Sequence, residues 1–63
     1  MGIIMEAYEN NKDLLQLHTK DEDEYLGIVI VDEDNDYIII EDVMSHNEIS
    51  VIAKSNILYI GAL

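Results

Sequence analysis

Residues 27–42 read GIVIVDEDNDYIIIED, and this stretch decides the fold. It lies within two apolar runs rich in β-branched residues, 25–31 and 37–43, which flank the acidic segment 32–36. β-branched residues favour extended strands, and a short polar segment between two such runs is typical of antiparallel strands. Gly27 lies inside the first run, where a glycine predicts a sharp bend of the strand.

The same pattern continues on both sides of these two strands. Further strands are predicted at 14–19, 48–53 and 56–60, with a tight turn at Lys54 and Ser55 before the last of them. Short strands at this spacing, separated by polar turns, indicate a small antiparallel barrel or sandwich.

A short helix is predicted before the first strand, over residues 1–8. Its apolar residues recur at helical spacing, at Met1, Ile4, Met5 and Tyr8. We place its end at 10–11, because the two asparagines there tolerate the left-handed conformation of a helix terminus. Residues 1–63 are therefore interpreted as a single domain, with the helical segment at 1–11 and the barrel at 13–61.

Composition limits the ways in which this fold can be stabilised. A chain of 63 residues buries only about 60% of the surface that its unfolded form exposes, so a lone copy should be marginally stable. The chain has no cysteine, which rules out disulfides and thiolate metal sites and leaves oligomerisation as one remaining support. No apolar run approaches the ~18 residues that span a membrane, and the start of the chain lacks the features of a signal peptide. We expect a cytoplasmic protein with no membrane partner.

Two strand properties point to association between copies. The second and third predicted strands are continuously apolar, which suggests that both of their faces are covered. The last strand carries no charge from residue 56 onward, and the chain has no proline to discourage edge-to-edge pairing. We expect the last two strands of neighbouring copies to pair, through the candidate interface residues Ile49, Val51, Ile57, Leu58 and Tyr59.

The spacing of residues around the bend resembles the Sm-like (LSm/Hfq-type) family. Gly27 is followed by Glu33 at +6 and by Tyr37 at +10, and then by three isoleucines and Glu41-Asp42. A second, weaker likeness is the segment 52–57, whose turn carries Lys54. The resemblance covers residues 13–61 and implies a mostly β fold, with a short N-terminal helix and a strongly bent five-stranded antiparallel barrel. It also implies a homo-oligomeric ring that binds RNA in RNA metabolism.

The resemblance assigns candidate RNA-binding residues to the two turns of the ring pore, namely Asn35, Tyr37, Lys54 and Ser55. Stacking of a base on an aromatic ring is worth about 1–3 kcal/mol, and Lys54 would supply the cation. The alternative is that Tyr37 packs at the strand edge while Lys54 points to solvent or pairs with a carboxylate. The family's Arg-Gly is absent here and phosphate contacts would be few, so single-stranded RNA binding should be weak.

The net charge of −11, from 14 acidic residues against three lysines, leaves two other interpretations open. One is an acidic ring that serves as a protein-binding scaffold and has lost RNA binding. The other is an acidic mimic of nucleic acid that occupies the basic site of another protein. If the copies form a ring, Asp32, Glu33, Asp34 and Asp36 of every copy should gather near one pore, and their mutual repulsion should raise their pKa values.

No residue pattern indicates an enzyme or a cofactor. The serines lack a nucleophile-elbow context, and the three glycines are isolated rather than grouped into a phosphate-binding loop. His18 and His46 lie far apart in the sequence with no neighbouring ligand pattern. The acidic segment resembles the start of a calcium loop, but Tyr37 and Val43 stand where such a loop needs Gly and Glu. We therefore expect no enzymatic activity, no cofactor and no metal.

Overall fold

The computed structural model describes residues 2–8 and 14–63, so the helix end expected at 10–11 lies outside the described residues. The elements follow one another as α1 (Ile3–Tyr8), β1 (Leu15–Thr19), β2 (Glu24–Glu33), β3 (Tyr37–Asp42), β4 (Glu48–Ala53), the 3-10 turn η1 (Lys54–Asn56) and β5 (Ile57–Ala62). Each strand predicted from the sequence is present, and the fourth has the predicted bounds.

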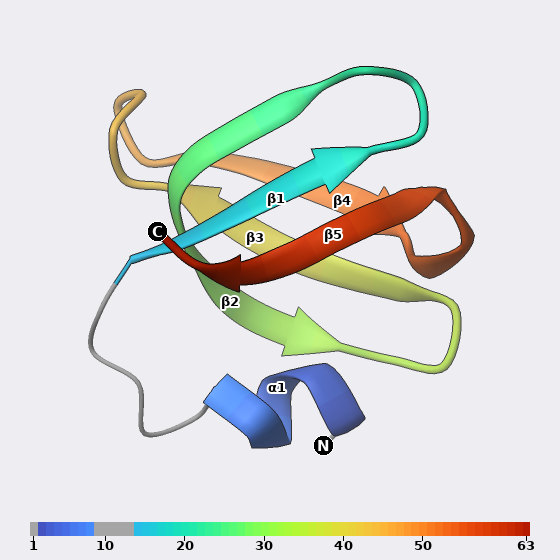
Figure 1. Cartoon of the computed structure of the whole chain (residues 1–63). Coiled ribbons are helices and arrows are strands. Elements are labelled where there is room, and N and C mark those ends of the chain that lie inside the picture. The colour runs from blue at the N-terminus through green and yellow to red at the C-terminus, as the bar shows by residue number, and fades with distance from the viewer. Residues whose placement is uncertain (1, 9–13) are drawn as a thin grey trace.

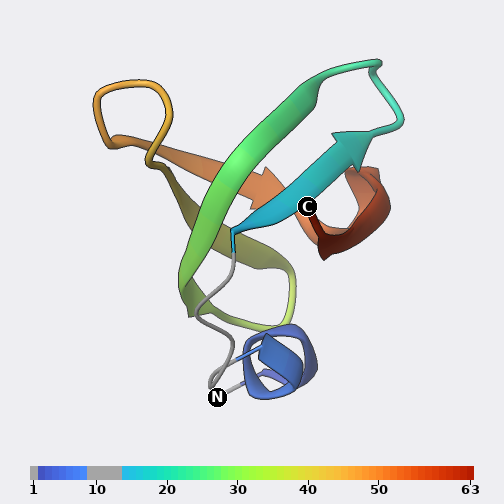
Figure 2. The same cartoon turned by 60° about the vertical axis from the view of Figure 1, so that its left-hand side comes forward.

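The five strands form one antiparallel sheet in the order β4-β3-β2-β1-β5 (Figure 1). From β1 to β4, each strand pairs with the next one in the chain. The last strand, β5, returns to pair with β1. The sheet is strongly curved, and α1 lies across the open end of the curved sheet beneath β2 (Figures 1 and 2). This arrangement confirms the predicted fold class and is consistent with a strongly bent, Sm-like barrel.

The bend in β2 depends on Gly27. The β1–β2 register changes there, from Leu15 opposite Ile28 to Gln16 opposite Leu26, which leaves Gly27 as a bulge residue. Its φ of +86° lies in the region that favours glycine, and a Cβ at this position would overlap the Met44 side chain. The sequence prediction of a bend at Gly27 is therefore confirmed.

A second irregularity in β2 decides which carboxylate points inward. Ile30 pairs with Ile40 and Asp32 pairs with Ile39, so Val31 is an extra residue without a partner in β3. Strict alternation from Ile30 would turn Asp32 toward the core, and the bulge turns Glu33 inward instead. The prediction that 32 and 33 belong to the turn is wrong, because β2 extends to Glu33.

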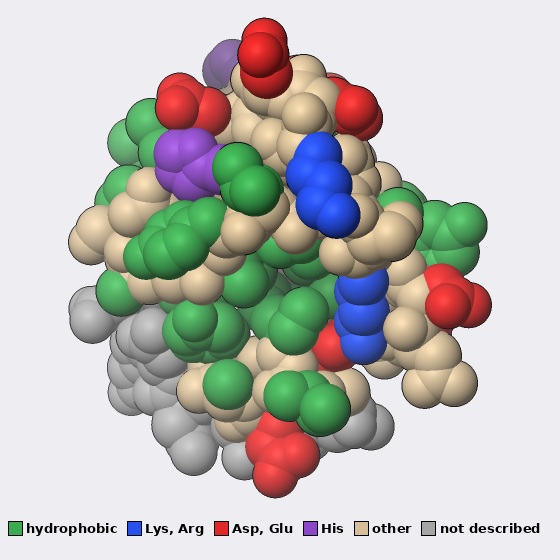
Figure 3. Space-filling view, turned by 45° about the vertical axis from the view of Figure 1, so that its right-hand side comes forward, with side chains coloured by type: hydrophobic (Ala, Val, Ile, Leu, Met, Phe, Trp, Pro, Cys, Tyr) green, Lys and Arg blue, Asp and Glu red, His purple; other side chains and the backbone are tan. Residues whose placement is uncertain are grey.

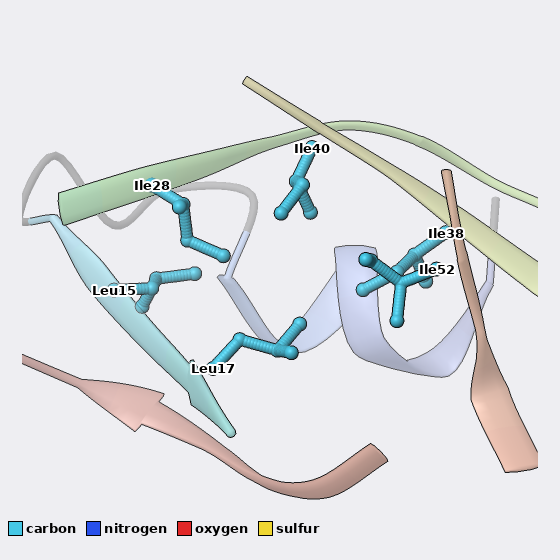
Figure 4. Close-up of a cluster of buried hydrophobic side chains, with 6 residues drawn as sticks. All are labelled: Leu15, Leu17, Ile28, Ile38, Ile40 and Ile52. Carbon is cyan, nitrogen blue, oxygen red and sulfur yellow. The ribbon is translucent and has the colours of Figure 1, made fainter. Parts of the chain in front are cut away.

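The core is formed by side chains from the concave side of the sheet (Figure 4). Its buried members are Leu15, Leu17, Ile28, Ile38, Ile40 and Ile52. Ile4 and Tyr8 of α1 pack against this cluster, which confirms the apolar helix face expected from their spacing. The helix is stabilised by this packing, since six residues do not form a stable helix alone.

The convex side of the sheet differs from the prediction that both faces of the second and third strands are covered. Val31 and Tyr37 remain about half exposed within one chain, at 46% and 48%. The continuous apolar character of these strands therefore does not reflect burial of both faces within one chain.

Candidate functional site

The turn between β2 and β3 and the turn η1 lie side by side at one end of the barrel. Tyr37 is the first residue of β3 and pairs with Ala53, the last residue of β4. The Lys54 N–H donates to the Asp36 carbonyl at 2.8 Å, which joins the two turns. The structure thus brings the candidate residues Tyr37 and Lys54 to the same end, with Asn35 and Ser55 exposed beside them.

Asp34 holds the β2–β3 turn in shape. Its Oδ1 atom accepts hydrogen bonds from the backbone N–H of Tyr37 at 2.7 Å and of Asp36 at 2.8 Å. These bonds lower the pKa of Asp34, because they stabilise the ionised carboxylate. The pKa rise expected where copies meet at a pore stays a prediction, and within one chain the Asp34 carboxylate orders the backbone that presents Tyr37.

Lys54 forms an ion pair with Glu33. The Lys54 Nζ and Glu33 Oε2 atoms lie 2.5 Å apart, and the Glu33 side chain has no accessible surface while that of Lys54 is 27% exposed. Figure 3 shows a lysine side chain touching an acidic one, beside a hollow lined by hydrophobic side chains. The alternative in which Lys54 pairs with a carboxylate is therefore the observed arrangement.

The same carboxylate also caps α1. Glu33 accepts hydrogen bonds from the backbone N–H of Met5 at 2.6 Å and of Ile4 at 3.3 Å. Burial by itself raises the pKa of Glu33, but the Lys54 hydrogen bond and the two backbone N–H groups lower it further than burial raises it. Within one chain Glu33 thus has a lowered pKa and joins three segments, and the rise expected where copies meet at a pore stays a prediction.

Sequence reasoning missed this role of Glu33 because it depends on the β2 bulge. Without the bulge at Val31, alternation turns Glu33 to solvent, and no residue in the sequence marks the bulge. The sequence does offer one signal for this role. Glu33 lies next to an apolar strand, and the chain has only three lysines with which a buried carboxylate could pair.

The edge of β4 carries unpaired backbone groups. Hydrogen bonds alternate along an antiparallel ladder, and the bond from Lys54 to Asp36 fixes that alternation. The N–H and C=O groups of Ile49 and Val51 therefore point away from β3. Both side chains are exposed, at 55% and 62%, and among the described residues no side chain bonds these groups.

The edge of β5 is partly protected by the helix. Leu63 donates to Leu14 at 3.1 Å, and the alternation from there turns the backbone groups of Ile60 away from β1. The Ile60 carbonyl accepts a hydrogen bond of 3.3 Å from the Tyr8 hydroxyl. Leu58 and Tyr59 are exposed at 69% and 50%, whereas Ile57 packs against the core.

The histidines lie in different surroundings. His18 Nε2 and the Gln16 Oε1 atom are 2.8 Å apart, and His18 Nδ1 lies 3.5 Å from a Glu24 oxygen. His46 lies in the β3–β4 turn with a left-handed φ of 57°. Within residues 2–8 and 14–63, no three His, Cys, Asp or Glu side chains gather as metal ligands would.

Comparison of the chain with protein-family models, curated proteins and solved structures finds no significant match. None of the helices within residues 2–8 and 14–63 has the length and apolar character needed to cross a bilayer.

Proposed function

We propose that this chain is a subunit of an Sm-like ring, in which β4 of one copy pairs with β5 of the next. The observation that carries the proposal is the pair of sheet edges. Among the described residues, β4 and β5 each pair with one strand, and both carry exposed apolar residues. Apolar sheet edges with free backbone groups, as along β4 and the part of β5 that Tyr8 leaves open, are templates for strand addition.

Two further features support assembly into a ring. β4 and β5 are different edges of one sheet, so each contact between copies is head-to-tail, and such contacts form a ring when the rotation between copies closes. The short turn η1 joins the two edges and fixes the angle between them. Pairing would also add buried apolar surface to a subunit that is small for its fold.

The end formed by Tyr37 and Lys54 supports weak RNA binding as the role of that ring. Tyr37 offers an exposed ring for stacking. Lys54 is already neutralised by Glu33, and a chain of net charge −11 repels phosphate, so counterion release on binding is small. Any affinity for single-stranded RNA should depend on Tyr37 and fall little with added salt.

Native mass spectrometry, with and without oligo-U and oligo-A, tests assembly and RNA binding together. We expect one closed stoichiometry for the unmodified chain at micromolar concentration. Leu58→Lys, on the edge strand, should disperse it, whereas Ile3→Lys should not. Ile3 is the matched control, since it is 83% exposed and lies on α1 rather than on an edge. A folded monomer, or equal dispersal by both variants, would contradict the proposal.

A further inference from the structure

The convex side of β3 and β4 carries a group of apolar side chains outside the core. Tyr37, Ile39, Ile49 and Val51 alternate with the buried residues of the same strands and so point away from the core. Three of them are about half exposed or more, at 48% for Tyr37, 55% for Ile49 and 62% for Val51. We call these four side chains, together with Glu41, the outer β3–β4 face.

The strand register makes this group contiguous. Ile39 lies opposite Val51, and Glu41 lies opposite Ile49. Both are non-hydrogen-bonded pairs of the ladder, and side chains approach one another most closely in pairs of that kind. On the other flank of β3, Ile39 lies opposite Asp32. The outer β3–β4 face is therefore an apolar surface with one carboxylate within it and another at its border.

Pairing of β4 with another strand does not cover this face. Strand addition uses the backbone groups at the edge, whereas the side chains of the face stand perpendicular to the sheet. In the proposed ring, β5 of the next copy would extend the sheet beside Ile49 and Val51 and leave their outer surface accessible. An apolar surface rimmed by polar groups is typical of a protein-binding site.

The charge of the face selects the kind of partner. Two copies stacked on this face would oppose Glu41 to Glu41 and Asp32 to Asp32, in chains that each carry −11. Like charges placed opposite one another are destabilising. Neither of the described lysines, Lys20 and Lys54, belongs to this face.

We propose that the outer β3–β4 face binds a basic protein segment with an apolar side. Its apolar residues would pack on Tyr37, Ile39 and Val51, and its Lys or Arg side chains would pair with Glu41 and Asp32. The proposal rests on the strand register and not on ring formation, so it holds for a monomer as well.

Two synthetic peptides of equal length and charge test the proposal, one built from Leu and Lys and one from Ser and Lys. In isothermal titration of the full chain at 0.15 M salt, where the Debye length is about 8 Å, long-range attraction is screened and apolar contact decides. We expect the Leu/Lys peptide to bind about tenfold tighter or more, as burial of two aliphatic side chains predicts. Equal binding of the two peptides would overturn the proposal.

Variants then locate the binding. Ile39→Thr keeps a β-branched residue on an interior strand, and it should abolish the preference for the Leu/Lys peptide. Glu41→Gln should weaken the binding of both peptides several-fold. Glu22→Gln removes the same charge from the β1–β2 turn and should change little. Binding that persists in Ile39→Thr, or that Glu22→Gln weakens as much as Glu41→Gln, would refute the assignment.

Backbone amide shifts in a ¹⁵N spectrum provide the second measurement, and they also show that each variant is folded. Peptide-induced shifts should cluster on β3 and β4. Shifts concentrated in residues 20–24 would show charge attraction alone and would contradict the proposal. Leu58→Lys separates this proposal from the ring, because a dispersed subunit should still bind the Leu/Lys peptide. Self-association that Ile39→Thr abolishes would show a second copy on the face, and would also overturn the proposal.

Discussion

Replacing Glu33 with Gln should destabilise the fold strongly at neutral pH. The carboxylate accepts from Lys54 Nζ at 2.5 Å, from Met5 N–H at 2.6 Å and from Ile4 N–H at 3.3 Å. The glutamine oxygen can keep one of these bonds. Its NH₂ group is itself a donor, so it cannot bond the remaining N–H groups. Loss of a charge-assisted hydrogen bond costs about 1.5–3 kcal/mol, and we expect about 2 kcal/mol here because Lys54 is partly screened by water.

The assay is thermal unfolding of both proteins at one concentration, followed by circular dichroism. For a domain of this size, about 2 kcal/mol lowers the midpoint by roughly 8–16 °C. Glu48→Gln is the control, because it makes the same change at an exposed position of β4. Its midpoint should stay close to that of the unmodified protein.

The pH dependence gives the sharper test. The pKa of Glu33 is lower in the folded protein than its ordinary value, so its stabilising effect is complete above the unfolded pKa. That effect is lost as the pH falls through the folded pKa, because a protonated Glu33 resembles Gln. The two midpoints should therefore begin to converge as the pH falls below the ordinary pKa of Glu, about 4.3. Midpoints that coincide at pH 7, or that differ by the same amount at pH 3, would refute the reasoning.

Three other changes have definite outcomes. Gly27→Ala should lower the thermal midpoint by several degrees, because φ is +86° and the Met44 side chain fills the space of a Cβ, whereas a Ser45→Ala control should not. Asp34→Ala should lower the midpoint more than Asp34→Asn, whose amide oxygen can still accept the turn hydrogen bonds seen at Asp34. Tyr8→Phe frees the Ile60 carbonyl and should strengthen association between copies about three- to tenfold in analytical ultracentrifugation; unchanged association would show that this carbonyl takes no part in pairing.

Much of the fold could be predicted because its signals are local. Apolar runs separated by polar turns located every strand, and the spacing of Ile4 and Tyr8 located the helix face. Gly27 was recognisable because a glycine within a β-branched run typically marks a bend or a bulge. These features depend on residues within a few positions of one another, so a single sequence contains them.

The details of the site could not be predicted in the same way. The bulge at Val31 reverses the sides of Asp32 and Glu33, and it results from packing of β2 against β3 rather than from residue preference. The pairing of Glu33 with Lys54 then follows from contacts across 21 positions of sequence. The exposure of the outer face of β3 was mispredicted because isoleucine favours strands whether or not its side chain is buried.

The place of Glu33 has a consequence for the order in which the protein folds. Ribosomal synthesis delivers α1 before β2, and β2 before the turn that carries Lys54. A six-residue helix has no stability of its own, and its first N–H groups find their acceptor only when β2 has bent around the core. A carboxylate enclosed there without Lys54 would be costly, so docking must also wait for the segment after β4. We expect the segment that is translated first to be among the last to reach its native position.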